Sequence, residues 1–125
     1  MHPHLINGFK YDMRIYVVVT CFDPLTIWLY DEGLVRFATQ KYSTKNRKDI
    51  FCHLTNFAIN RKSKNFKKNS GAAEGEEGAS KWSLSFLKQV FQKHLGINFQ
   101  AEIMPKIEDL IIKTIVSVDS HLANN

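Results

Sequence analysis

The chain has 125 residues, 44% of them hydrophobic, and a formal net charge of +5 at pH 7. This length supports one domain with a modest core, and the hydrophobic fraction excludes a disordered or collagen-like chain. The sequence also excludes a membrane-spanning helix, because no apolar run approaches about 18 residues, and it lacks the basic-then-apolar start of a secretion signal.

The first part of the chain predicts antiparallel strands. Residues 15–22 (IYVVVTCF) are almost wholly apolar, as in a strand covered on both faces. Where this strand begins, a period of two places Lys10, Asp12 and Arg14 on one face. The row of two cations and one anion is long enough to follow a polyphosphate. The simpler interpretation is an exposed strand end with an internal ion pair.

Further strands are expected in the next segments. Residues 26–30 (TIWLY) are rich in β-branched and aromatic side chains and predict a second strand. Residues 31–33 (DEG) predict a tight turn, and residues 34–39 (LVRFAT) a third strand. Residues 50–59 (IFCHLTNFAI) are again apolar. Strands are therefore expected over about residues 9–39 and 50–59.

Two helices are expected in the last third of the chain. Residues 80–95 carry apolar side chains at steps of three and four, with Ser80 as N-cap and Gly96 as the stop. A second apolar stripe predicts a helix over residues 101–118, with Pro105 in its first turn. Strands followed by helices predict an α+β fold.

Positive charge is concentrated in one stretch. Residues 41–68 contain nine Lys or Arg and one acid, Asp49. Residues 60–79 are basic, then rich in Gly and Glu, and predict a surface loop. Such a field attracts an anionic partner, for example nucleic acid, acidic lipid or an acidic protein tail. A solvated loop that serves only solubility is the plainer alternative.

Four local features contain residue types that commonly bind ligands or take part in catalysis. Besides the row on residues 10–14, Arg36 lies between apolar neighbours, where a guanidinium requires a partner or a substrate anion. The stretch CHLTN presents the hydrogen-bonding side chains of His53, Thr55 and Asn56. The cations that follow begin with Arg61 and Lys62.

Each feature also has a structural interpretation. Arg36 could pair across strands with Asp31 or Asp12. His53 could be a half-buried histidine whose hydrogen bonds are satisfied, and Thr55 and Asn56 could cap a turn. The aromatic residues are expected in the core rather than as stacking platforms.

Common catalytic and metal motifs are missing. The sequence has no Walker P-loop, no Rossmann fingerprint and no nucleophile elbow. Cys21 and Cys52 lie in apolar stretches and are expected to be buried thiols in a reducing compartment, by default the cytosol. No His/Cys cluster has zinc spacing, so no metal site is expected within these residues.

The order of several motifs carries a resemblance. The strings GFKYDMRIYVVV, EGLVRFAT, CHLTNFAIN, KWSLSFL and IEDLIIKTI, in this order, resemble the tubulin tyrosine ligase-like family from about residue 5 to residue 118. The resemblance implies part of an ATP-grasp fold and an ATP-dependent ligase that joins an amino acid to tubulin through an acyl phosphate. Within the family, the chain looks most similar to polyglutamylases, which add free L-glutamate.

The resemblance implies a role for each candidate residue. Lys10 and Asp12 match positions that line the ATP site, and Arg14 one that reaches the terminal phosphates. Arg36 matches an arginine that holds the incoming amino acid or the acyl phosphate. His53, Thr55 and Asn56 match a segment beside the nucleotide phosphates. Arg61 and Lys62 are expected to bind the substrate on electrostatic grounds, because tubulin tails are strongly acidic.

The family pattern also implies parts that are not in this sequence. An upstream ATP-binding lysine, an adenine-binding segment and a later strand with Mg²⁺ ligands are expected outside this chain, so that the 125 residues alone are expected to be an inactive fragment. The implied partners are the acidic C-terminal tails of tubulin, and the implied location is the cytoplasmic microtubule cytoskeleton, including cilia or flagella. Neither nucleic acid nor a membrane is expected as a partner.

Two other interpretations stay open. The chain could be a non-catalytic module that docks on acidic tubulin tails through residues 41–68. It could also be a glycylase or a tyrosine ligase of the same family. A basic nucleic-acid-binding domain is a third class, which would show salt-sensitive affinity, but no nucleic-acid-binding motif supports it.

Overall fold

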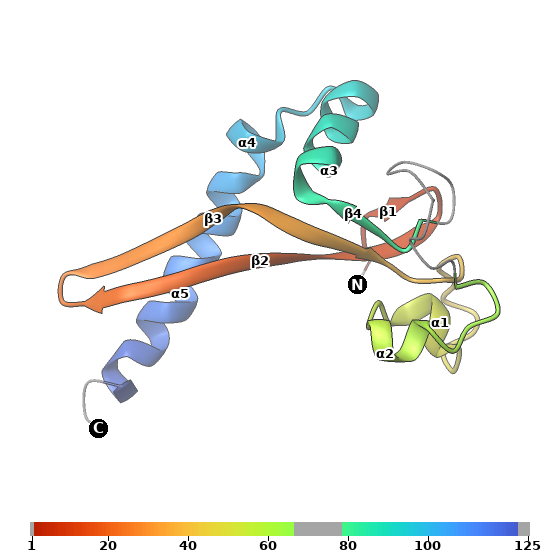
Figure 1. Ribbon diagram of the computed structural model, residues 1–125, viewed down its shortest axis with the longest axis horizontal. Coiled ribbons are helices and arrows are strands. Elements are labelled where there is room, and N and C mark those ends of the chain that lie inside the picture. The colour runs from red at the N-terminus through yellow and green to blue at the C-terminus, as the bar shows by residue number, and fades with distance from the viewer. Residues whose placement is uncertain (1, 67–78, 123–125) are drawn as a thin grey trace. The chain divides into compact units, whose positions relative to one another are not determined.

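The computed structural model describes residues 2–66 and 79–122 and shows a mixed fold with an antiparallel sheet and several helices (Figure 1). Four strands lie in the order β1-β2-β3-β4. They are β1 (Leu5–Ile6), β2 (Phe9–Phe22), β3 (Leu25–Phe37) and β4 (Lys81–Ser83). The pairs β1–β2 and β3–β4 are antiparallel, with Val35 of β3 opposite Trp82 of β4. The antiparallel sheet expected from the sequence is therefore confirmed.

The expected tight turn at residues 31–33 is wrong, because β3 continues through it. A Cβ atom added at Gly33 would lie 2.6 Å from the backbone oxygen of Arg14. The glycine thus permits close approach of two backbones rather than a reversal of the chain. One long strand replaces the two short strands that the sequence suggested.

The expected strand at residues 50–59 is also wrong. This segment forms two short helices, α1 (Ile50–His53) and α2 (Phe57–Asn60). The side chain of Asp49 accepts a hydrogen bond of 3.0 Å from the Phe51 amide and so caps α1. A cap of this kind, just ahead of the apolar run, was the available sign of a helix. Asn60 ends α2, and residues 67–78 of the expected loop lie outside the described residues.

The helix expected over residues 80–95 begins later, because residues 81–83 pair with β3 as β4. It consists of α3 (Leu84–Val90) and a π-helical turn, η1 (Phe91–Leu95). The Ser83 hydroxyl, rather than that of Ser80, accepts a hydrogen bond of 3.2 Å from the Phe86 amide near the start of α3. Gly96 ends the helix in the left-handed conformation, with φ 63°, as predicted.

The last two helices are α4 (Phe99–Glu102) and α5 (Met104–Leu122). The single helix expected over residues 101–118 is therefore interrupted at Ile103, and α5 continues to Leu122. Pro105 is the second residue of α5, so it lies in a first turn as expected. The Asn98 side chain caps α4 by accepting from the Ala101 amide at 3.2 Å. Among the described residues, no helix is long and apolar enough to cross a membrane.

The chain divides into two compact units. The first unit, Met1–Ile15 with Glu32–Leu87, holds the main core, in which Val35, Leu84 and Leu87 are almost completely buried. The ring of Trp82 meets those of Phe37 and Phe86 edge to face, at 4.7 and 5.0 Å between centroids. The expectation that aromatic residues line the core is confirmed for Phe37 and Trp82, which are buried, whereas Phe86 is half-buried. It is wrong for Tyr16, Trp28 and Phe57, which are exposed.

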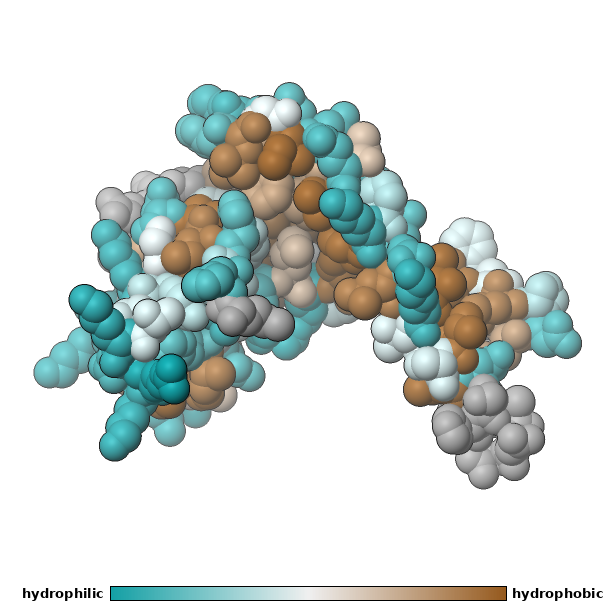
Figure 2. Space-filling view, turned by 180° about the vertical axis from the view of Figure 1, so that it is seen from behind, coloured by the Kyte–Doolittle hydropathy of each residue, from teal (hydrophilic) through white to brown (hydrophobic). Residues whose placement is uncertain are grey.

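The second unit, Tyr16–Asp31 with Lys88–Asn125, has a smaller core around Phe91, Phe99 and Met104. Hydrophobic side chains remain exposed along α5, where they form part of the brown surface in Figure 2. They are Leu110, Ile112, Val116 and Val118. Of the two cysteines, Cys52 is buried as expected, whereas Cys21 is exposed because it lies near the end of β2.

Candidate functional site

The row of charged residues on β2 has the predicted geometry. β2 is one continuous strand, so Lys10, Asp12 and Arg14 point to the same face. Lys10 and Asp12 are half-buried and Arg14 is exposed. The face therefore presents one cation to solvent and keeps a lysine and a carboxylate partly shielded.

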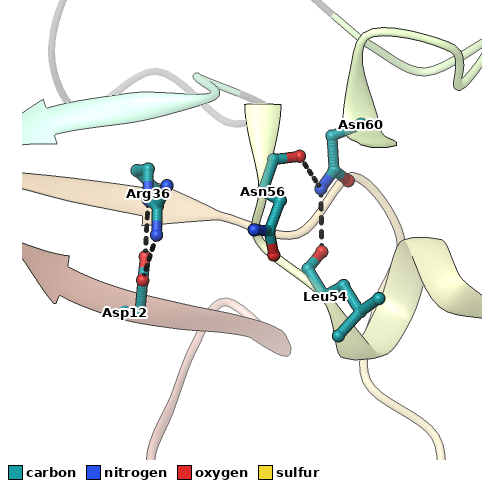
Figure 3. A network of polar contacts seen from close by, with 5 residues as sticks. All are labelled: Asp12, Arg36, Leu54, Asn56 and Asn60. Atoms are coloured by element: carbon teal, nitrogen blue, oxygen red, sulfur yellow. Dashed lines mark hydrogen bonds and ion pairs between the residues drawn. The ribbon is translucent and has the colours of Figure 1, made fainter. Parts of the chain in front are cut away.

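Arg36 lies on the neighbouring strand and binds Asp12 at two points. The Arg36 Nε donates to Asp12 Oδ1 at 3.0 Å, and Nη2 donates to Oδ2 (Figure 3). The Arg36 side chain is 17% exposed and that of Asp12 is 39% exposed. Of the two partners that the sequence left open, Asp12 is the one found. This fork fixes the guanidinium plane in a partly desolvated position.

The period of β3 explains how an arginine can stand in an apolar segment. Val35 and Phe37 are buried and point to the core face. Arg36, between them, points to the opposite face, where its register partner on β4 is Lys81. The core thus holds the strand in place, while the Arg36 side chain lies on the opposite face and is 17% exposed.

His53 is held by the chain itself. Its Nε2 lies 2.9 Å from the carbonyl oxygen of Asn46, which can only accept, so Nε2 donates. Its ring also meets that of Tyr42 edge to face, with 5.4 Å between centroids. These contacts favour the structural interpretation of His53.

Thr55 and Asn56 lie in the extended connection between α1 and α2. Asn56 occupies the N-cap position of α2, but its side chain makes no capping hydrogen bond. The side chain of Asn56 is exposed and that of Thr55 half-buried. Asn56 therefore does not form the suggested side-chain cap, and its carboxamide makes no capping hydrogen bond to α2.

Asn60 was missed by the sequence interpretation and is the most thoroughly bonded side chain of this region. It is 2% exposed. Its Oδ1 accepts from the Thr39 amide at 3.1 Å and the Thr39 hydroxyl at 2.8 Å. Its Nδ2 donates to the carbonyls of Leu54 at 2.8 Å and Asn56 at 3.0 Å (Figure 3). Nothing in the sequence distinguishes it from the exposed Asn65 nearby.

The basic stretch is exposed where the structure describes it. Arg61 follows α2, and its amide bonds to the Phe57 carbonyl at 2.9 Å. The exposed cations are Lys41, Lys45, Arg47, Lys48, Arg61, Lys62 and Lys64. Within residues 2–66 and 79–122, no ion pair involves any of them. Their charge is therefore available to an anionic partner.

The chemistry of these donors suits an anion rather than a metal ion. Ammonium, guanidinium and amide groups are phosphate and carboxylate ligands. Over the described parts of the chain, no group of three His, Cys, Asp or Glu side chains is placed to hold a metal. The described donors therefore suit anionic groups such as phosphate or carboxylate.

Comparison of the sequence with known proteins identifies a family. The model of the tubulin-tyrosine ligase family matches residues 1–125. The chain is 44% identical to tubulin polyglutamylase TTLL5 of Mus musculus and 47% identical to tubulin polyglutamylase TTLL13 of Homo sapiens. It is 43% identical to tubulin monoglutamylase TTLL4 of Mus musculus.

Each of these matches covers 98% of the chain. It covers only 9% of TTLL5, 10% of TTLL4 and 14% of TTLL13, so the chain spans a small part of the relatives' length. Because the family model matches the whole sequence, the chain belongs to the tubulin-tyrosine ligase family.

Proposed function

We propose that these residues are part of an ATP-dependent ligase that joins free L-glutamate to a glutamate side chain of tubulin. The observation that carries the proposal is the Arg36 guanidinium, fixed by Asp12 on a strand next to Lys10 and Arg14. The names of the relatives, which include both polyglutamylases and a monoglutamylase, support glutamate as the amino acid and tubulin as the acceptor.

Bound ATP would supply the phosphoryl group that turns the tubulin carboxylate into an acyl phosphate. Arg14, the exposed cation of the row, is suited to the terminal phosphates, with Lys10 closer to the shielded end. Thr55 and the side-chain carboxamide of Asn56, which does not cap α2, offer hydrogen bonds from the neighbouring segment. In this assignment His53 and Asp12 border the nucleotide, and Asp12 also holds Arg36. Mg²⁺ would need ligands beyond those described here.

Arg36 is suited to bind the substrate because a guanidinium presents a planar fork of N–H donors that matches carboxylate and phosphate oxygens. Held in one plane, it would receive the carboxylate of the incoming glutamate or the oxygens of the acyl phosphate. Positive charge that is oriented before the reaction stabilises the charge that develops when the amine attacks the acyl carbon. The amine then loses a proton, and phosphate leaves as the amide bond forms.

The fold and the location follow from the same proposal. We infer that the sheet and helices are a section of an ATP-grasp domain, and that the protein works on microtubules. The exposed cations of residues 41–64, including Arg61 and Lys62, would contact the acidic tubulin tails. Their exposure also supports a second candidate, a non-catalytic module that docks on these tails without using Arg36.

The test is incorporation of labelled glutamate into microtubules by the native polypeptide, expressed at its full length, with ATP and Mg²⁺. Arg36→Ala is expected to abolish incorporation. Lys113→Ala is the matched control, because Lys113 pairs at 2.7 Å with Asp109 on the exposed side of α5 and should leave incorporation unchanged. Incorporation by Arg36→Ala at the wild-type rate would refute this role of Arg36. Binding to microtubules without incorporation would favour the docking module.

A further inference from the structure

Asn60 bonds to two backbone segments, and these segments carry different parts of the candidate site. We propose that Asn60 is a positioning residue that holds the connection between α1 and α2, with Thr55 and Asn56, against the end of the strand that carries Arg36. The inference rests on the proposed function, because it assumes that this connection contacts the nucleotide.

The first segment is the end of β3. Thr39 lies just beyond the last residue of β3, Phe37, and both its amide and its hydroxyl donate to Asn60 Oδ1. The Thr39 amide also donates to the Phe51 carbonyl at 3.1 Å, as does the amide of Gln40. The end of the strand is therefore tied to α1 through the backbone and to α2 through the Asn60 side chain.

The second segment is the connection itself. Leu54 and Asn56 flank Thr55, and both have extended backbone angles, so helical hydrogen bonding is interrupted there. Asn60 Nδ2 donates to the carbonyls of Leu54 and Asn56. The Asn56 carbonyl also accepts from the backbone amides of Ile59, at 3.2 Å, and Asn60, at 3.0 Å. Because one buried carboxamide bonds to both ends of the connection formed by residues 54–56, this side chain restrains the extended conformation of the connection.

The side chain that makes these bonds is itself fully used. A carboxamide has two donor hydrogens and an oxygen with two acceptor positions, and each is occupied at Asn60. At 2% exposure it has no room to donate to a ligand as well. Its role is therefore to orient Thr55 and Asn56, whose side chains take no part in these four hydrogen bonds, rather than to bind substrate directly.

The test compares Asn60→Asp with Asn65→Asp in the native polypeptide at its full length. Asn60→Asp would keep the acceptor for Thr39 but place a carboxylate oxygen against the carbonyls of Leu54 and Asn56. Asn65→Asp introduces the same charge at an exposed position of the same basic stretch. Amide hydrogen exchange of residues 52–57 should become faster in Asn60→Asp and remain unchanged in Asn65→Asp.

Kinetics separate a positioning role from loss of fold. Asn60→Asp is expected to raise KM for ATP about tenfold or more and to leave KM for glutamate near its wild-type value. Simple loss of folded protein would lower the maximal rate and leave both KM values unchanged, which would overturn the proposal. Unchanged exchange at residues 52–57 would overturn it equally. If the wild type neither binds ATP nor transfers glutamate, the proposed function fails, and faster exchange in Asn60→Asp would still support the hold on the connection.

Discussion

Asp12 and Arg36 form a two-point ion pair between neighbouring strands, on the face of β3 that turns away from the buried Val35 and Phe37. The pair unites two residues that the sequence resemblance assigned to different ligands, Asp12 to the nucleotide and Arg36 to the amino acid. In the structure the Asp12 carboxylate binds and orients the Arg36 guanidinium. Substitution of Asp12 should therefore affect the binding of the amino acid.

Asp12→Asn tests this coupling. The amide keeps one acceptor oxygen for Arg36 Nε but loses the charge and the second acceptor, so the guanidinium is held at one point. We expect kcat/KM for glutamate to fall about tenfold or more, because charge-assisted hydrogen bonds are the stronger ones. Asp109→Asn, which breaks the exposed pair with Lys113, is the control for steady-state kinetics. A loss confined to KM for ATP would show that Asp12 serves the nucleotide alone.

Gly33→Ala should destabilise the first unit. The added Cβ would meet the Arg14 backbone oxygen at 2.6 Å, and a backbone atom cannot step aside as a side chain can. A loss of about 3 kcal/mol in the free energy of unfolding is expected. Gly96→Ala is the comparison, because its Cβ would meet nothing within 4 Å and only the left-handed backbone opposes it, at about 1 kcal/mol. Urea unfolding in which Gly33→Ala is the milder change would contradict this account.

Glu32 makes a pH-dependent contribution to the same region. Its carboxylate accepts from the Gly33 amide at 2.9 Å and the Ser85 amide at 3.0 Å. Hydrogen bonds from Gly33, then Ser85, hold the pKa of Glu32 below its ordinary value. A carboxyl whose folded-state pKa is depressed contributes stability above its unfolded-state pKa, and this contribution is lost as the pH falls through the folded-state pKa.

The measurement is thermal unfolding of wild type and Glu32→Gln as a function of pH. Glutamine keeps an acceptor oxygen but carries no charge. The wild type is expected to be the more stable at pH 7 by a constant margin, which then shrinks in the acid range below the ordinary pKa of a glutamate. A margin that is constant down to the lowest pH would mean that the charge of Glu32 adds nothing to stability.

The exposed cations should act through their collective field. Reversal of charge at Lys45, Arg47 and Lys48 is expected to raise KM for microtubules several-fold and to weaken its dependence on salt. Because these residues lie away from the Asp12–Arg36 pair in the sequence and make no ion pairs in the described part of the chain, kcat should change little. The measurement is titration with microtubules at several salt concentrations. A fall in kcat without a change in KM for microtubules would argue against a docking role.

Local sequence patterns predicted part of the candidate site but not the structure around it. The period of two correctly placed Lys10, Asp12 and Arg14 on one face, since β2 runs without interruption. The same reasoning found Arg36 and named Asp12 as one possible partner. It took the residues DEG for a turn, because the close contact between Gly33 and the Arg14 carbonyl is long-range and leaves no local trace.

Two further errors have physical causes of the same kind. Residues 50–59 look like a strand because they are apolar, but the cap at Asp49 and the tertiary bonds of Asn60 stabilise short helices. Asn60 itself falls in the segment expected to be a loop, because nothing in its neighbourhood shows that its amide is buried. Its hydrogen bonds reach Thr39, which is 21 positions away in the chain.

The most direct test of the central claim is to identify the amino acid that appears on tubulin. Microtubules would be incubated with the full-length native polypeptide, ATP, Mg²⁺ and an equal mixture of glutamate, glycine and tyrosine, and their tails analysed by tandem mass spectrometry. The account predicts glutamate joined to the side chain of a tail glutamate, with none added when ATP is omitted or when Arg36 is replaced by Ala. Addition of glycine or tyrosine instead, or no addition at all by the wild type, would contradict it.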